Sequence, residues 1–120
     1  MKPTAQHHFE EFVQYLRVPV WRNGELIEWH EDNHRFVAEW RNKHLLLCIM
    51  LAKPEGDTSA LLHRLYGRAT PQRFIGLPVR VYQDQESIIG ALAIPEEAVR
   101  TKQLMQLQEN LRHMFEAEMS

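Results

Sequence analysis

The sequence predicts an α+β fold: a five-stranded antiparallel twisted sheet with three helices, in the order α-β-β-β-α-β-β-α. Three observations predict it. Apolar residues recur at helical spacing near both ends of the chain and once in the middle. Between these stretches, short apolar or alternating runs are separated by turn residues. No repeat or long linker divides the 120 residues, so one domain spanning residues 1–120 is expected.

Three amphipathic helices are expected. Thr4 is the predicted N-cap of the first, which runs for about twelve residues. The second begins at a cap on Thr58 or Ser59, and Gly67 is expected to end it. The third and longest is expected over residues 96–119.

Five strands are expected, at residues 26–29, 34–40, 44–52, 77–82 and 87–94. The second strand alternates apolar and polar residues, which indicates one buried and one solvated face. The third and fifth are apolar on both faces, so they are expected to be covered on both sides. Gly90 in the fifth strand is small enough to let a helix come close.

Charge and composition exclude several classes of partner. The formal net charge is −2 and the Lys and Arg residues are scattered, so no nucleic acid partner is expected. The longest apolar run, residues 45–52, is far shorter than the roughly 20 residues that span a bilayer, so no membrane insertion is expected. The N-terminus is unlike a signal peptide, and the single Cys48 fits a reducing compartment. A cytoplasmic protein is therefore predicted.

Catalytic motifs are absent from the sequence. Its glycines are isolated, which excludes a Gly-rich phosphate loop, and no serine lies in a nucleophile elbow. No enzymatic activity and no cofactor are therefore predicted. Among seven histidines, His30 and His34 flank a turn that also carries Glu31 and Asp32. We interpret them as solvated turn residues and predict no metal, with a metal site as the alternative.

The predicted strands carry more apolar surface than the predicted helices can cover. Two strands are apolar on both faces, and three helices on one side of a sheet leave its other side exposed. Large exposed apolar patches normally mark interaction sites. A second polypeptide is therefore expected to supply cover, and a symmetric homodimer is the default.

The C-terminal part carries a resemblance to a known family. The segment 84–92, which leads into the last predicted strand, is followed by Pro95-Glu96-Glu97 and then by a long helix with Leu104, Leu107 and Leu111. This arrangement, the element order and the length resemble the class I chaperones of bacterial type III secretion, the Tir-chaperone-like family. The resemblance covers essentially the whole chain in topology.

The resemblance implies a dimer that binds the non-globular N-terminal segment of a secreted effector or apparatus protein and keeps it secretion-competent. A heterodimer with another chaperone is also compatible with it. The region that resembles a dimer interface comprises Leu61, Leu62, Leu65, Tyr66, Phe74 and Ile75. The region that resembles an effector-binding surface comprises Phe9, Phe12, Val13 and Leu16.

Other interpretations remain open at this stage. Both apolar stripes are equally compatible with an ordinary core. The chain is also compatible with a different dimeric α/β protein-interaction or adaptor domain, and with a His-rich metal-binding protein or enzyme.

Overall fold

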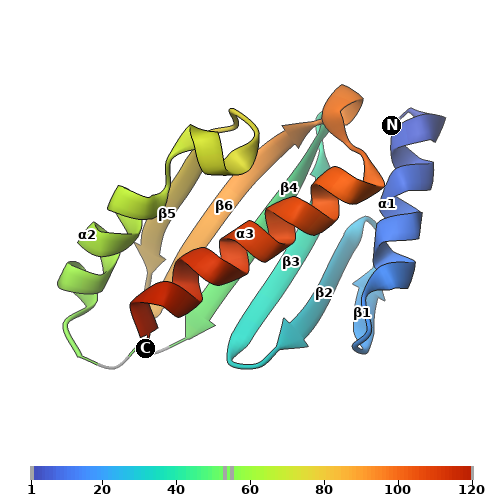
Figure 1. Ribbon diagram of the computed structural model, residues 1–120. Helices are drawn as coiled ribbons and strands as arrows, with labels where there is room; N and C mark the ends of the chain where they lie inside the picture. Colours follow the sequence, from blue (N-terminus) through green and yellow to red (C-terminus); the bar gives the residue numbers. More distant parts are fainter. Residues whose placement is uncertain (1, 53, 55, 120) are drawn as a thin grey trace.

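A single antiparallel sheet of six strands, in the order β1-β2-β3-β4-β6-β5, carries the helices on one of its faces (Figure 1). The computed structural model describes residues 2–52, 54 and 56–119. Its strands are β1 Val20–Asn23, β2 Leu26–Glu31, β3 His34–Arg41, β4 His44–Ala52, β5 Val79–Asp84 and β6 Ser87–Pro95. Its helices are α1 Pro3–Tyr15, α2 Thr58–Arg68 and α3 Thr101–Met119, with short 3₁₀ turns η1 Pro71–Phe74 and η2 Glu96–Ala98.

The α+β class and the three helices agree with the prediction, but the sheet has six strands rather than five. The additional strand is β1, which forms a hairpin with β2 across a turn that contains Gly24 at φ 62°. The Asn-Gly pair is a strong hairpin signal. The sequence-based prediction nevertheless missed the strand, because four residues after Pro19 are too few to display a periodicity of two.

Helix boundaries differ from the prediction at several ends. Lys2 is the N-cap of α1, and Thr4 lies inside the helix. At α2 the cap is Asp57, whose side chain accepts a hydrogen bond from the backbone N–H of Ala60 at 3.2 Å. Gly67 lies within the last turn of α2 instead of ending it.

The last helix is shorter than predicted. Residues Glu96–Ala98 form the turn η2, and Val99 is extended before α3 begins at Thr101. The backbone N–H of Lys2 donates to the largely buried Glu96 carboxylate at 3.1 Å, which ties this turn to the start of α1.

Aromatic side chains pack the helices onto the sheet. Phe9 and Phe12 of α1 meet Trp40 and Trp29 edge to face, with ring centroids 5.6 and 5.9 Å apart. On α3, Phe115 lies against the sheet near Gly90, where an added Cβ would be only 2.9 Å from the ring. The prediction that Gly90 admits a close approach is therefore confirmed.

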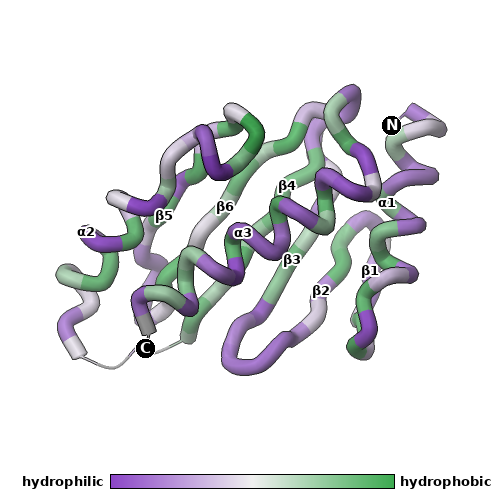
Figure 2. Tube along the Cα trace, in the orientation of Figure 1, coloured by the Kyte–Doolittle hydropathy of each residue, from purple (hydrophilic) through white to green (hydrophobic). Residues whose placement is uncertain are grey.

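The opposite face of the sheet carries no helix in the described part of the chain. The predicted alternation of β3 is confirmed, since Phe36 and Ala38 are buried under the helices and Val37 points away from them. Hydrophobic residues follow β4 along its length (Figure 2). We call the helix-free side the open face. At its centre, on β4 and β6, lie Leu46, Cys48, Met50, Ile89, Ala91 and Ala93.

Candidate binding surfaces

Exposed apolar side chains are the most prominent feature of the molecular surface. Among the described residues no group of three or more His, Cys, Asp or Glu side chains is placed to hold a metal ion. His30 and His34 lie on opposite faces of the sheet, and His30 is exposed whereas His34 is buried. The two side chains therefore do not converge on one metal ion.

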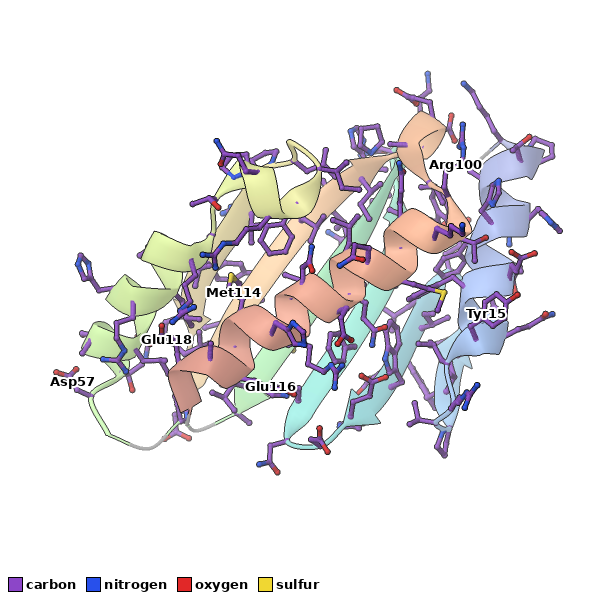
Figure 3. The ribbon with its side chains drawn as sticks, in the orientation of Figure 1. Tyr15, Asp57, Arg100, Met114, Glu116 and Glu118 are labelled. Atoms are coloured by element: carbon purple, nitrogen blue, oxygen red, sulfur yellow. The ribbon has the colours of Figure 1, made fainter. Side chains whose placement is uncertain are left out.

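One candidate surface is the corner where α1 meets β1. Tyr15 at the end of α1 is 57% exposed and Trp21 on β1 is 54% exposed. Figure 3 shows Tyr15 pointing outward from the end of its helix. We call this surface, with the adjacent Leu16, Val18 and Met105, the α1–β1 corner.

Two shallow grooves meet at this corner. One, of about 450 Å³, runs between α1 and α3 and is lined by Tyr15 and Met105 among others. The second, of about 530 Å³, lies along β1 beside Trp21. His30 lines both grooves, so the groove between α1 and α3 and the groove along β1 adjoin at this residue.

Polar contacts hold the corner in place. Arg22 on β1 donates to the Glu10 carboxylate of α1, with a 3.0 Å hydrogen bond from Nη1. On the other side of the groove, Gln108 of α3 donates to Glu31 of β2 at 3.0 Å. Side-chain hydrogen bonds therefore link β1 to α1 and α3 to β2 around the exposed aromatic residues of the corner.

The predicted effector-binding residues are only partly available. Phe9 and Phe12 are fully buried against the sheet and belong to the core, because they face Trp40 and Trp29. Val13 and Leu16 are half-buried at the helix edge. Of the predicted stripe, only these two contribute surface.

A second candidate surface lies between α2 and α3. A groove of about 980 Å³ is lined by Arg68, Arg73, Ile75 and residues of α3. Glu118 near the end of α3 accepts hydrogen bonds from Arg68 and from Arg64, the latter at 2.7 Å, and so joins the two helices (Figure 3).

The residues predicted for a dimer interface divide in the same way. Leu61, Leu65 and Phe74 are buried in the core of the chain itself, because they face inward from α2 and η1. Leu62 is half-buried, while Tyr66 and Ile75 are exposed. Leu61, Leu65 and Phe74 therefore form the core beneath this surface. Leu62, Tyr66 and Ile75 remain accessible to a partner.

The third candidate surface is the open face. Its centre is uncharged, and charged side chains flank it on both sides. On the β3 side Arg35 pairs with Glu28, with a 2.9 Å hydrogen bond from Nη2, and this pairing holds the pKa of Glu28 below its usual value. Arg41 pairs with Glu39. At the centre, burial raises the pKa of the Cys48 thiol, which leaves the thiol protonated at neutral pH.

Arg80 is the flanking charge on the β5 side. Its guanidinium carbon lies 5.5 Å from the centre of the Tyr82 ring. Within the described ranges it forms no ion pair.

Sequence reasoning missed the exposed aromatic residues of the α1–β1 corner. Of the three tryptophans, Trp29 and Trp40 are core residues, as is usual for aromatic residues in a small α/β protein, and Trp21 is not. One signal for Trp21 was present in the sequence: it lies two residues before an Asn-Gly pair, which is typical of a hairpin turn. The strand that carries it, β1, lies at the edge of the sheet. No sign of the exposure of Tyr15 was present in the sequence, because Tyr15 adjoins the apolar stripe of the first helix.

Solved structures with this fold include proteins of type III secretion. A chain of the HopA1–SchA chaperone–effector complex matches with a TM-score of 0.66 at 16% identity, covering 93% of this chain and 90% of that chain. A chain of the heterodimeric ExoU–SpcU complex from the type III secretion system of Pseudomonas aeruginosa matches with a TM-score of 0.64 at 18% identity, covering 90% and 91%. YbjN from E. coli, a protein proposed as a transcription regulator, matches with a TM-score of 0.63 at 10% identity, covering 93% and 90%.

The protein therefore has the fold of the class I type III secretion chaperones, and the predicted resemblance is confirmed. More specifically, the chain belongs to the SsaM family, whose sequence profile matches residues 3–118. No curated protein sequence matches it significantly. Across the described residues, none of the helices combines the length and hydrophobicity needed to cross a membrane.

Proposed function

We propose that this protein is a type III secretion chaperone. It acts in the cytoplasm as a dimer, binds the non-globular N-terminal segment of a secreted effector or apparatus protein, and keeps that segment competent for secretion. This function involves no catalytic step and no cofactor.

The observation that carries this proposal is the pairing of exposed aromatic residues with an unpaired sheet edge. β1 hydrogen-bonds only to β2 among the described strands, so its other edge offers backbone N–H and C=O groups to an incoming strand. Tyr15 and Trp21 lie on either side of that edge. An extended peptide gains main-chain hydrogen bonds from such an edge and side-chain contacts from the flanking pockets.

The shape of the corner favours an extended ligand over a folded one. Its two grooves are shallow and adjoin at His30, one beside α1 and the other along β1. A chain without tertiary structure can follow such a path and place successive side chains on both faces of the sheet.

The test is co-expression with the N-terminal segments of proteins secreted by the same system, followed by co-purification and titration calorimetry. We expect one such segment to bind, and Trp21→Arg to weaken it by about tenfold or more, since a charge replaces an aromatic anchor. Trp21→Phe, which keeps an aromatic ring at the same exposed position, is the matched control and should bind nearly normally. Failure of every segment to bind, or equal loss in both variants, would contradict the proposal.

A dimeric adaptor domain that binds a folded partner is the second candidate. The groove between α2 and α3 favours it, because it is larger than the grooves at the corner and lies next to the exposed Ile75. Hydrogen exchange of a purified complex separates the two: a secretion segment protects β1, whereas a partner seated in that groove protects α2 and α3.

A further inference from the structure

Ile75 has a backbone conformation that its side chain disfavours. It follows the turn η1 with φ 54° and ψ 39°, which lies in the left-handed region. A β-branched residue rarely adopts this region, because its branched Cβ crowds a backbone carbonyl oxygen. The other non-glycine residues with a left-handed backbone in the described part of the chain are unbranched at Cβ and lie at hairpin turns: Asp32, Asn42, Lys43 and Gln85.

The environment of Ile75 within the chain does not account for an isoleucine there. Its side chain is 51% exposed, so much of the apolar burial that an isoleucine offers is unused. The turn is held by backbone hydrogen bonds, from Gly76 to Pro71 at 2.8 Å and from Leu77 to Phe74 at 2.9 Å. Asparagine or glycine would allow both bonds without strain. A strained residue that presents an apolar side chain to water is typical of a surface that a partner covers.

Ile75 lines the groove of about 980 Å³ between α2 and α3, which we call the α2–α3 groove. The other described lining residues come from α2, η1 and α3, and none comes from a strand. Asn110 of α3 donates to the carbonyl oxygen of Arg73 in η1 at 2.6 Å, and Glu118 joins α3 to α2. These bonds fix the groove before any ligand arrives.

The charged residues at the groove favour an anionic ligand. Of the formally charged side chains in the described lining, Arg68 and Arg73 are cations and Glu116 is the anion. Glu116 already lies 3.8 Å from Arg112, and Arg68 already pairs with Glu118. Within the described ranges the Arg73 guanidinium forms no ion pair. A carboxylate on the ligand would therefore meet an unpaired cation beside an exposed apolar side chain.

We propose that the α2–α3 groove binds an acidic amphipathic helix of a second protein, with an apolar side chain of that helix over Ile75 and a carboxylate on Arg73. The ligand is helical because no strand edge lines the groove to pair with an extended chain, whereas a helix seats its apolar face between two others through side chains alone.

This inference goes beyond the proposed function, because it gives the chaperone a second partner. α2 lies at the end of the sheet that carries β5, and the α1–β1 corner lies at the opposite end (Figure 1). A secretion segment at the corner and a helix in the groove therefore do not compete for space.

Synthetic peptides of about 18 residues, long enough to form an isolated helix, are the probes. One carries leucine at helical spacing with glutamate on the flanks of the leucine stripe, a second has lysine in place of every glutamate, and a third is the acidic peptide with a central proline. Each is titrated into the isotope-labelled full chain and followed by NMR chemical shifts. The acidic peptide should shift resonances of α2, η1 and α3 and bind about tenfold or more tightly than the other two, because lysine opposes Arg73 and proline breaks the helix.

A charge reversal tests the role of Arg73. Arg73→Glu should reverse the preference, so that the lysine peptide binds more tightly than the acidic one. Arg80→Glu makes the same change in net charge at an exposed position on the open face, and this matched control should keep the preference for the acidic peptide.

A second variant tests the role of Ile75. Ile75→Asn should weaken binding of the acidic peptide about fivefold or more without lowering the melting temperature of the isolated protein, because asparagine accepts the left-handed backbone. Tyr82→Asn removes an exposed apolar side chain outside the groove and should bind the peptide normally.

Each contrary result overturns the inference. No shift at acidic peptide concentrations up to about 1 mM removes the site. Equal binding of the acidic peptide and either control peptide removes the acidic helix, as does an unchanged preference in Arg73→Glu. A melting temperature lowered by about 5 °C or more in Ile75→Asn would mean that Ile75 serves its own fold.

Two further results would assign the groove to another occupant. Resonances of α2 and α3 that change with protein concentration in the absence of peptide would assign it to a second copy of the chain. A secretion segment that shifts α2 and α3 and is lost in Arg73→Glu would assign it to the secreted protein. The chaperone proposal is tested separately, by segment binding at β1 and its loss in Trp21→Arg.

Discussion

Gly90 determines how closely α3 approaches the sheet. A Cβ atom built at this position lies 2.9 Å from Cε1 of Phe115 and 3.2 Å from Cγ2 of Ile49, both in the packed core. We expect Gly90→Val to lower the free energy of unfolding by about 1–3 kcal/mol, because the ring has no room to withdraw. Urea denaturation measures this change.

The control for Gly90 is Gly67, which lies within α2 and does not have a left-handed backbone. A Cβ atom added to Gly67 would meet nothing within 4 Å. Gly67→Ala should raise stability by up to about 1 kcal/mol, since alanine favours the helix. If Gly90→Val were as stable as the unmodified protein, α3 would not pack against β6 as closely as the structure indicates.

His34 makes stability depend on pH. The side chain is only 2% exposed, stands edge to face against Phe115, and neither ring nitrogen has a hydrogen-bond partner among the described residues. Burial lowers the pKa of His34, although nearby carboxylates oppose this. The charged groups that face it are Glu116 and Arg112 from α3 and Glu31 and Asp32 from β2 and its turn.

Because the folded state disfavours protonated His34, the unfolded state binds more protons in mild acid. Stability is therefore complete above the unfolded pKa of about 6.5 and declines as the pH falls below it. His34→Leu should flatten the dependence of the free energy of unfolding on pH between about 7 and 5.5, whereas the exposed-site variant His30→Gln should retain it. Parallel pH profiles of His34→Leu and the unmodified protein would contradict this assignment.

At the scale of single elements, α2 depends on a cap that sequence reasoning placed one or two residues too late. Asp57 accepts the hydrogen bond from Ala60, while the expected caps Thr58 and Ser59 lie inside the helix. Asp57→Ala should cost about 1 kcal/mol of stability, measured by thermal or urea unfolding. Ser59→Ala, the matched control at an exposed site, should change stability by less than about 0.5 kcal/mol.

The elements that sequence predicted well are those whose burial is regular. β4 has the bounds predicted from its apolar run, residues 44–52, and β3 follows its alternation of buried and less buried residues. β1 escaped prediction because an edge strand of four residues is stabilised by its hairpin partner rather than by its own pattern. Caps were misplaced because Asp57, Thr58 and Ser59 are all good capping residues, and only the backbone angles choose among them.

The candidate surfaces were harder to predict than the fold. Hydrophobic spacing identifies a buried stripe but does not separate core from interface, so Phe9 and Leu65 were grouped with residues that the structure exposes. The whole-molecule argument was more robust. The strands have more apolar surface than three helices can cover, and one face of the sheet is indeed left without helices in the described part of the chain. This conclusion required only the number of helices and strands and the hydrophobicity of the strands.

At the scale of the whole molecule, two tyrosines distinguish the possible dimers. Tyr66 projects from α2, and Tyr82 lies on the open face beside Arg80; both are at least partly exposed, so neither change should unfold the chain. If the copies meet through the open face, Tyr82→Asp separates them and Tyr66→Asp leaves them paired, because only the first places an unpaired charge in the contact. Sedimentation equilibrium at matched concentrations decides between them. Leu65→Asp would be uninformative for this purpose: Leu65 is fully buried within its own chain, so the carboxylate should cost about 3 kcal/mol or more and unfold the protomer before any interface is tested.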